Sequence, residues 1–167
     1  HWFFDQKNAS WWEDEFGAST VQPTSAFVLD GDSSDDRVLL LGGEDGYIRK
    51  WDEAATGDDG NAIDSLVLFG PLTTPEMENE MRFSHLMPVL ADDQDGARFE
   101  LFARNTPDST GNPLASGSLI PGRNPTKNLR VRGSHVWVRL RNAAQSQRWA
   151  FESMSINASP AGRKRVR

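Results

Sequence analysis

The chain has 167 residues, 37% of them hydrophobic, and contains no cysteine. A globular core is therefore available, while disulfides, thiolate metal sites and cysteine nucleophiles are excluded. The longest apolar runs, residues 38–41 and 66–69, are far too short for a transmembrane helix. The chain opens at His1 inside an aromatic run, without an initiator methionine or a basic leader, which indicates a segment of a longer protein.

Charge is distributed very unevenly along the sequence. Residues 1–96 contain 21 Asp/Glu and 5 Lys/Arg, a net charge of −16, whereas residues 97–167 contain 3 and 13, a net charge of +10. Such asymmetry predicts either a surface for nucleic acid or a head-to-tail partner of opposite sign. The plainer alternative is that each half is simply well solvated.

Short strands separated by turn residues are predicted throughout the first part of the chain. Apolar residues do not recur at helical spacing over any long stretch, and turn signals come every 8 to 12 residues. The expected strands cover residues 2–5, 11–14, 25–29, 38–42, 47–51 and 63–69. The apolar strand 38–42, its Gly-bounded turn and the strand that ends in Trp51-Asp52 are typical of the middle hairpin of a β-propeller blade. We therefore expect residues 1–72 to form one or two propeller blades.

A second set of strands is expected in residues 73–167. They cover residues 81–91, 98–104, 114–120, 127–132, 135–141 and 148–156, followed by a basic tail. Five or six antiparallel strands in this length predict a small β-sandwich.

The clearest hairpin signal is the two-residue Gly133-Ser134 turn between residues 127–132 and 135–141. Pairing across a type II′ turn places valines and leucines on one face and an arginine ladder on the other. The predicted ladder face consists of Arg130, Arg132, Trp137, Arg139 and Arg141. It is suited either to stacking and phosphate contacts with a single strand or to docking on an acidic neighbour, and we favour the protein interface.

Candidate sites for catalysis and metal binding are weak. Asp30, Asp32, Ser34 and Asp36 have the spacing of EF-hand ligands, but residue 35 is not the glycine and residue 41 is not the glutamate that this loop requires. The three histidines lie on separate predicted strands without metal-ligand spacing, and no nucleophile or phosphate-loop motif occurs. We expect no catalytic residue, no metal and no cofactor, and we interpret the chain as a non-enzyme.

Tryptophans near the start of the chain allow two interpretations. Trp2, Trp11 and Trp12 are spaced either to stack on sugar rings or to anchor a protein interface. We favour the interface.

Two stretches resemble bacteriophage virion proteins that contain a β-propeller. The stretch VLLLGGEDGYIRKWDEAATGDDGNAIDSLVLFGPL (residues 38–72) looks like their closing blade. The segments SLIPGRN (118–124) and RWAFES (148–153), with the GRKR tail, are similar to their C-terminal module. The nearest class is the tail nozzle, or tail tubular protein B-like protein, of short-tailed phages.

This resemblance implies a structural protein of the virion tail. Proteins of that class are hexameric rings with a channel through which DNA leaves, so the expected partners are other copies, other tail proteins and DNA in transit, with no membrane insertion. The expected acidic surface, past which DNA slides without sticking, consists of Asp30, Asp32, Asp35, Asp36, Asp58 and Asp59. The alternative function is a carbohydrate- or receptor-binding module of a phage tail or depolymerase.

Overall fold

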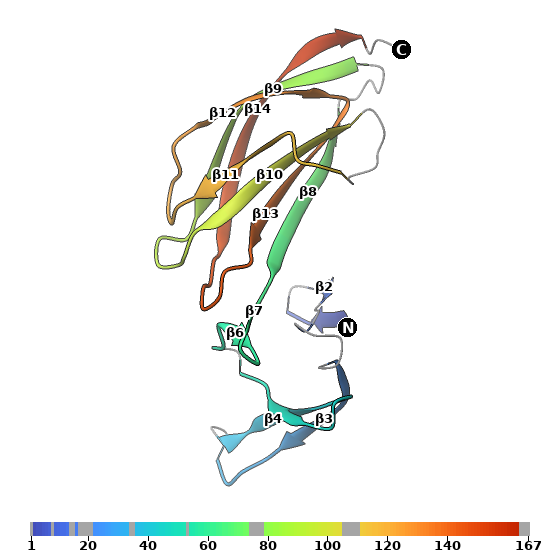
Figure 1. Ribbon diagram of the computed structural model, residues 1–167, viewed down its shortest axis with the longest axis vertical. Coiled ribbons are helices and arrows are strands. Elements are labelled where there is room, and N and C mark those ends of the chain that lie inside the picture. Colours follow the sequence, from blue (N-terminus) through green and yellow to red (C-terminus); the bar gives the residue numbers. More distant parts are fainter. Residues whose placement is uncertain are drawn as a thin grey trace. The chain divides into compact units, whose positions relative to one another are not determined.

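The computed structural model describes residues 2–7, 9–13, 16, 22–33, 36–52, 54–73, 79–104 and 111–163. These residues form antiparallel β-strands without an α-helix, and the all-β prediction is confirmed. No sheet among them is closed. None of the described segments is a helix of the length and hydropathy that crossing a bilayer requires. The chain divides into two compact units, His1–Ile63 and Asp64–Arg167, which are described separately below (Figure 1).

The first unit contains three small antiparallel sheets. Its strands are β1 (Trp2–Asp5), β2 (Ser10–Glu13), β3 (Pro23–Leu29), β4 (Val38–Gly43), β5 (Ile48–Lys50), β6 (Gly57–Asp58) and β7 (Asn61–Ala62). β1 pairs with β2, β6 pairs with β7, and β3, β4 and β5 form a three-stranded sheet in that order. The two hairpins predicted from the sequence, β1–β2 and β4–β5, are confirmed.

The β3–β4–β5 sheet keeps much of its apolar surface open. Every residue of β4 is half-buried, although an inner blade strand is expected to be fully covered. Phe27 on β3 and Ile48 on β5 are 64% and 73% exposed. The first unit alone therefore leaves this sheet without a complete hydrophobic cover.

The second unit contains two larger sheets. Its strands are β8 (Ser65–Thr73), β9 (Asn79–Leu90), β10 (Ala97–Arg104), β11 (Ala115–Leu119), β12 (Lys127–Gly133), β13 (His135–Asn142) and β14 (Phe151–Arg163). One sheet has the order β11–β10–β13–β8 and the other the order β12–β9–β14.

A single hydrophobic core draws side chains from both of these sheets. Its buried members are Phe83, Leu86, Leu90, Ala97, Phe99, Leu101, Leu119, Leu129, Val131, Val136, Val138 and Leu140. Alternation along β12 and β13 places every second residue in this core, as the sequence pattern predicts. The two sheets pack on this core with one face each, and the opposite face of each sheet carries charged side chains.

The predicted hairpin between residues 127–132 and 135–141 is wrong. β12 pairs with β9, whereas β13 pairs with β10 and β8, so the chain crosses from one sheet to the other at Gly133-Ser134. Gly133 lacks the positive φ that a type II′ turn needs at its first central position. Its role is close packing instead, because a Cβ at this position would lie 2.9 Å from the Cβ of Ala103.

The predicted boundary at residues 72/73 also differs from the structure. The division lies between Ile63 and Asp64, because β8 pairs along its length with β13. Local sequence identifies this strand but does not specify which sheet it joins.

Candidate interaction surfaces

The five residues of the predicted arginine ladder lie on two different sheets. Trp137, Arg139 and Arg141 belong to β13 in the four-stranded sheet, while Arg130 and Arg132 belong to β12 in the three-stranded sheet. Both sets point away from the shared core, but from separate faces, because the chain changes sheets between them. The ladder does not exist as one continuous surface.

On the four-stranded sheet, Arg139 is engaged within the unit. Its Nε donates a hydrogen bond to Oε2 of Glu100 at 2.6 Å, and its Nη2 lies 2.5 Å from the same oxygen as an ion pair. Its guanidinium also lies 5.0 Å from the centroid of the Phe102 ring. Trp137 is buried and stacks against the His135 ring at 6.1 Å between centroids. These contacts stabilise the sheet, so Arg139 and Trp137 are not available to bind another chain.

Arg141 and Arg98 complete the charge balance of this face. Arg141 donates to both carboxylate oxygens of Asp64, with 2.7 Å between Nε and Oδ1, and this pairing raises the pKa of the guanidinium further. Arg98 lies 3.7 Å from Glu100. Three arginines therefore share two carboxylates, so these five groups carry a net charge of +1.

The outer face of the three-stranded sheet is different. Arg132 pairs with Glu80 and donates to the carbonyl oxygen of Ala161 at 2.9 Å. Among the described residues, Arg82 and Arg130 have no ion-pair partner, although both are exposed. Arg123 is exposed as well, and its Nη2 contacts the sulfur of Met87 at 3.5 Å. This basic face, defined by Arg82, Arg123 and Arg130, keeps its positive charge.

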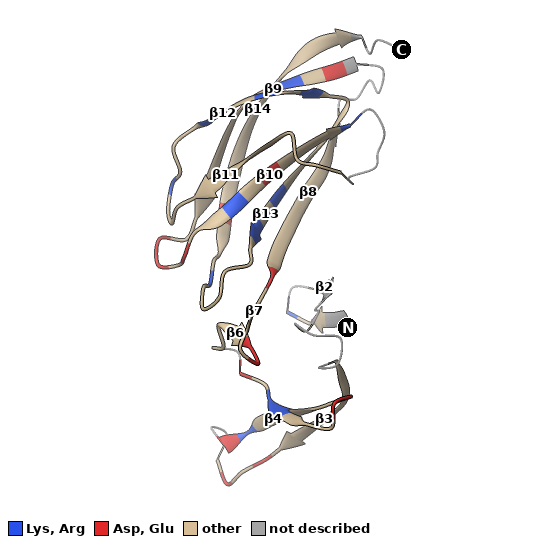
Figure 2. Ribbon diagram, viewed as in Figure 1, with Lys and Arg blue, Asp and Glu red and all other residues tan. Residues whose placement is uncertain are grey.

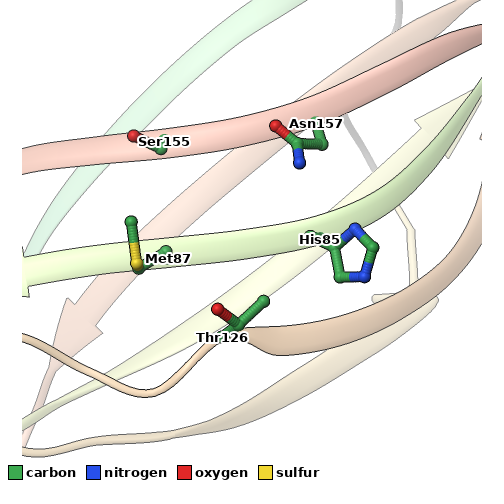
Figure 3. A pocket seen from close by; sticks show the side chains of 5 residues that line it. All are labelled: His85, Met87, Thr126, Ser155 and Asn157. Carbon is green, nitrogen blue, oxygen red and sulfur yellow. The ribbon is translucent and has the colours of Figure 1, made fainter.

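A pocket of about 270 Å³ opens on the basic face (Figure 3). It is lined by His85, Met87, Thr126, Ser155 and Asn157. His85 and Met87 come from β9, Ser155 and Asn157 from the neighbouring β14, and Thr126 immediately precedes β12. The lining offers hydroxyl, amide and imidazole groups for hydrogen bonding, with a thioether as its apolar part.

His85 owes its position to an irregularity in the central strand. The register shifts between Asn128 and Val131 on β12 and between Asn157 and Ala158 on β14, on both sides of Ser84. Such bulges re-aim side chains and commonly occur beside functional sites. Sequence alternation gives no signal for this bulge, so the pocket beside His85 could not be predicted from the residues alone.

The predicted acidic residues lie in two turns of the first unit, and their environments differ. Asp30 lies 3.1 Å from Arg37, and Asp36 accepts a hydrogen bond from Ser33 at 2.9 Å. Asp32 is exposed, and Asp35 lies outside the described residues. The first turn therefore keeps most of its negative charge (Figure 2).

The second turn is bound by Arg49, a residue that no sequence motif singles out. Arg49 donates to both carboxylate oxygens of Asp45, at 3.0 and 2.7 Å, and to Asp59 at 2.8 Å. These hydrogen bonds raise the pKa of Arg49, and the bond from Arg49 lowers the pKa of Asp45. Asp58, half-buried beside Asp59, precedes the turn that joins β6 to β7. Asp59 is thus partly neutralised and is a weaker element of an acidic surface than Asp32.

Aromatic residues of the β1–β2 hairpin form a small exposed cluster. The Phe4 and Trp11 rings lie 4.8 Å apart between centroids, and Trp11 is 64% exposed. The side chains of Trp2 and Trp12 lie outside the described residues. By contrast, Trp149 packs against the core of the second unit and donates from Nε1 to Ser65 at 2.6 Å.

In the described segments, no three histidine or carboxylate side chains are placed together to hold a metal ion. His1 lies outside these segments, and His85 and His135 stand on different sheets. Comparison with known proteins adds no assignment, because no family model matches the sequence and no curated protein matches it significantly.

Proposed function

We propose that this chain is a structural component of a bacteriophage tail that assembles with other copies of itself into a ring around the DNA ejection path. In this proposal the first unit supplies propeller-blade strands and the second unit is a β-sandwich. The resemblance of residues 38–72 and 118–153 to nozzle-type proteins supports the class of protein. The core shared by two antiparallel sheets supports the sandwich.

The observation that carries the proposal is the opposite charge of the two units. The first unit contains 14 Asp/Glu and 4 Lys/Arg, a net charge of −10, and the second contains 10 and 14, a net charge of +4. Two oppositely charged units within one chain attract the complementary units of other copies head to tail. Head-to-tail contacts close into rings when the rotation between copies is favourable.

The open apolar strands of the first unit agree with such an assembly. Blades of a propeller cover one another, and a blade seen alone exposes the surface that its neighbours would bury. Phe27 and Ile48 show this exposure.

Analytical ultracentrifugation of the whole chain tests the proposal, with electron microscopy of the same samples. We expect a closed ring at low ionic strength and its dissociation as salt screens the attraction between units. A monomer at all concentrations and salt conditions would contradict the proposal.

The exposed Phe4–Trp11 cluster favours one second candidate, a glycan-binding module. Paired aromatic rings on a surface stack against the apolar faces of sugars. Under this alternative, Trp11→Ala abolishes cosedimentation with host polysaccharide, whereas Tyr47→Ala, which removes another exposed aromatic ring of the same unit, leaves it unchanged. Equal retention of both variants would eliminate this candidate.

A further inference from the structure

Of the two outer faces of the second unit, one has Arg98, Arg139 and Arg141 in contact with carboxylates, and the other has arginines without such partners among the described residues. On the four-stranded sheet, Arg139 and Arg141 have carboxylate partners within the unit. On the basic face, Glu80 pairs with Arg132, and no described carboxylate pairs with Arg82, Arg123 or Arg130. Unpaired exposed arginines are frequent anchors of protein interfaces.

The pocket lies within this charged surface. Met87 in its lining contacts Arg123, and His85 stands opposite Asn128, two residues before Arg130. Arg123 therefore borders the pocket, while Arg82 lies on the same strand as His85 and Met87, and Arg130 lies on β12, which begins just after Thr126. The hydrogen-bonding groups of the pocket suit carboxylates. Two independent features, the uncompensated arginines and the polar pocket, therefore coincide on one face.

We propose that the basic face binds the acidic turn at Asp30–Asp36 of a second copy of this chain. This inference rests on the proposed self-assembly and names the surfaces that would make it. The turn suits the face because Asp30, Asp32 and Asp36 are exposed and, in the part of the chain that the structure describes, Arg37 is the one cation paired with them, whereas Asp59 is already bound by Arg49.

A protein partner suits this face better than a nucleic acid does. The outward residues of β9, β12 and β14 that are described include no exposed aromatic ring on which a base would stack. The complementary carboxylates are moreover supplied by the chain itself.

A charge-swap experiment tests the proposal. The first variant, Arg82→Glu with Arg130→Glu, reverses the basic face, and the second, Asp30→Arg with Asp32→Arg, reverses the acidic turn. Each variant alone should self-associate at least about tenfold more weakly than the wild type, because like charges then face each other. An equimolar mixture should regain assembly, since the reversed face of one variant meets the reversed turn of the other.

Controls separate this contact from general effects of charge and folding. Arg98→Glu introduces on the outer face of the other sheet the same charge change as Arg130→Glu, and it should leave assembly intact. Melting curves of all variants identify any that fail to fold. If the variant Arg82→Glu with Arg130→Glu does not fold, Arg130→Gln replaces it. This milder change only removes a charge, and its self-association is compared with that of the wild type in the same way.

The outcomes distinguish this inference from the proposed function. If the wild type forms no assembly, the proposed function fails. If it assembles and the face variant assembles equally well, or if the mixture of variants gains nothing, the proposed contact is overturned while the assembly stands. Binding of duplex DNA or acidic polysaccharide that depends on Arg82 and Arg130 in the assembled wild type would also overturn it, because the face would then be open.

Discussion

Glu100 points away from the core of the second unit, yet it is only 8% exposed. Arg139 donates a hydrogen bond to it from Nε and forms an ion pair with it through Nη2, and Arg98 lies at 3.7 Å. A carboxylate removed from water in this way depends on its partners. Arg139 therefore contributes chiefly to folding, and its replacement is a poor test of an interface.

Replacement of Arg139 by alanine should destabilise the second unit by about 2 kcal/mol, because the carboxylate of Glu100 loses its main donor. Arg98→Ala should cost no more than about 0.5 kcal/mol, since Arg98 is exposed and more distant. Urea unfolding followed by circular dichroism measures both values. Equal losses in the two variants would show that Glu100 does not depend on Arg139.

The pair formed by Asp45 and Arg49 gives the first unit a pH dependence of defined sign. The hydrogen bond from Arg49 lowers the pKa of Asp45 below its ordinary 3.8, with a further contribution from the backbone N–H of Tyr47. A lowered pKa in the folded state means that the stabilisation is complete above the unfolded pKa and is lost as pH falls through the folded pKa. The effect belongs to the range below about pH 4.

Asp45→Asn should therefore reduce stability at neutral pH and also reduce the loss of stability on acidification. Free energies of unfolding measured at about pH 7 and pH 3 for the wild type and the variant give the comparison. The remaining carboxylates titrate in both proteins, so only the difference between them reports on Asp45. If the free energy of unfolding falls by the same amount between the two pH values in both proteins, the Asp45–Arg49 pair does not contribute to the pH dependence of stability.

At the scale of elements, the passage from β12 to β13 decides how the second unit is built. If the chain made a tight hairpin at Gly133, a Cβ there would meet only solvent or turn atoms. In the observed crossover, Gly133 is buried and approaches Ala103 on β10. A hairpin and a crossover at this position therefore predict different effects on stability when a methyl group is added to Gly133.

Gly133→Ala should destabilise the second unit by about 1 to 3 kcal/mol through overpacking. Adding Ala103→Gly should recover part of this loss, because it removes the atom that the new Cβ meets at 2.9 Å. A double-mutant cycle in urea measures the coupling. Simple additivity of the two changes would argue against the crossover geometry.

The strands of both units were largely predictable because alternation and turn residues are local signals. The pattern of residues 127–141 correctly indicated that Val131 and Val136 face a core, yet both a hairpin and a crossover satisfy that alternation. The choice depends on contacts with β8 and β9, which lie far away in the sequence. For the same reason the arginines were predicted as one ladder, although Arg130 and Arg139 lie on different sheets.

For the whole molecule, the separation of charge bears on the passage of DNA. Each phosphate that a protein neutralises increases its affinity for DNA and the salt dependence of that affinity. A conduit with exposed arginines would retain DNA, whereas one whose arginines are covered would release it. The proposed contact covers the arginines of the basic face.

The assembled protein should therefore show negligible affinity for duplex DNA at physiological salt, despite its 18 lysines and arginines. Fluorescence anisotropy of a labelled duplex during a salt titration measures this affinity. The face-reversed variant, Arg82→Glu with Arg130→Glu, serves as the reference without the basic face. A sub-micromolar complex of the assembled wild type would contradict the conduit and assign the arginines to DNA binding.

The order of strands in the second unit also has a consequence for how fast this unit acquires its structure. Leu90 at the end of β9 pairs with Phe151, and Leu72 of β8 pairs with Val136. Pairings between residues far apart in the sequence slow folding, because the entropy cost of closing the loop comes before the stabilising contacts form. During synthesis, β8 and β9 therefore emerge long before the strands that complete their sheets. The second unit must fold largely after its translation, and its apolar strands are exposed to chaperones and to neighbouring chains until β13 and β14 arrive.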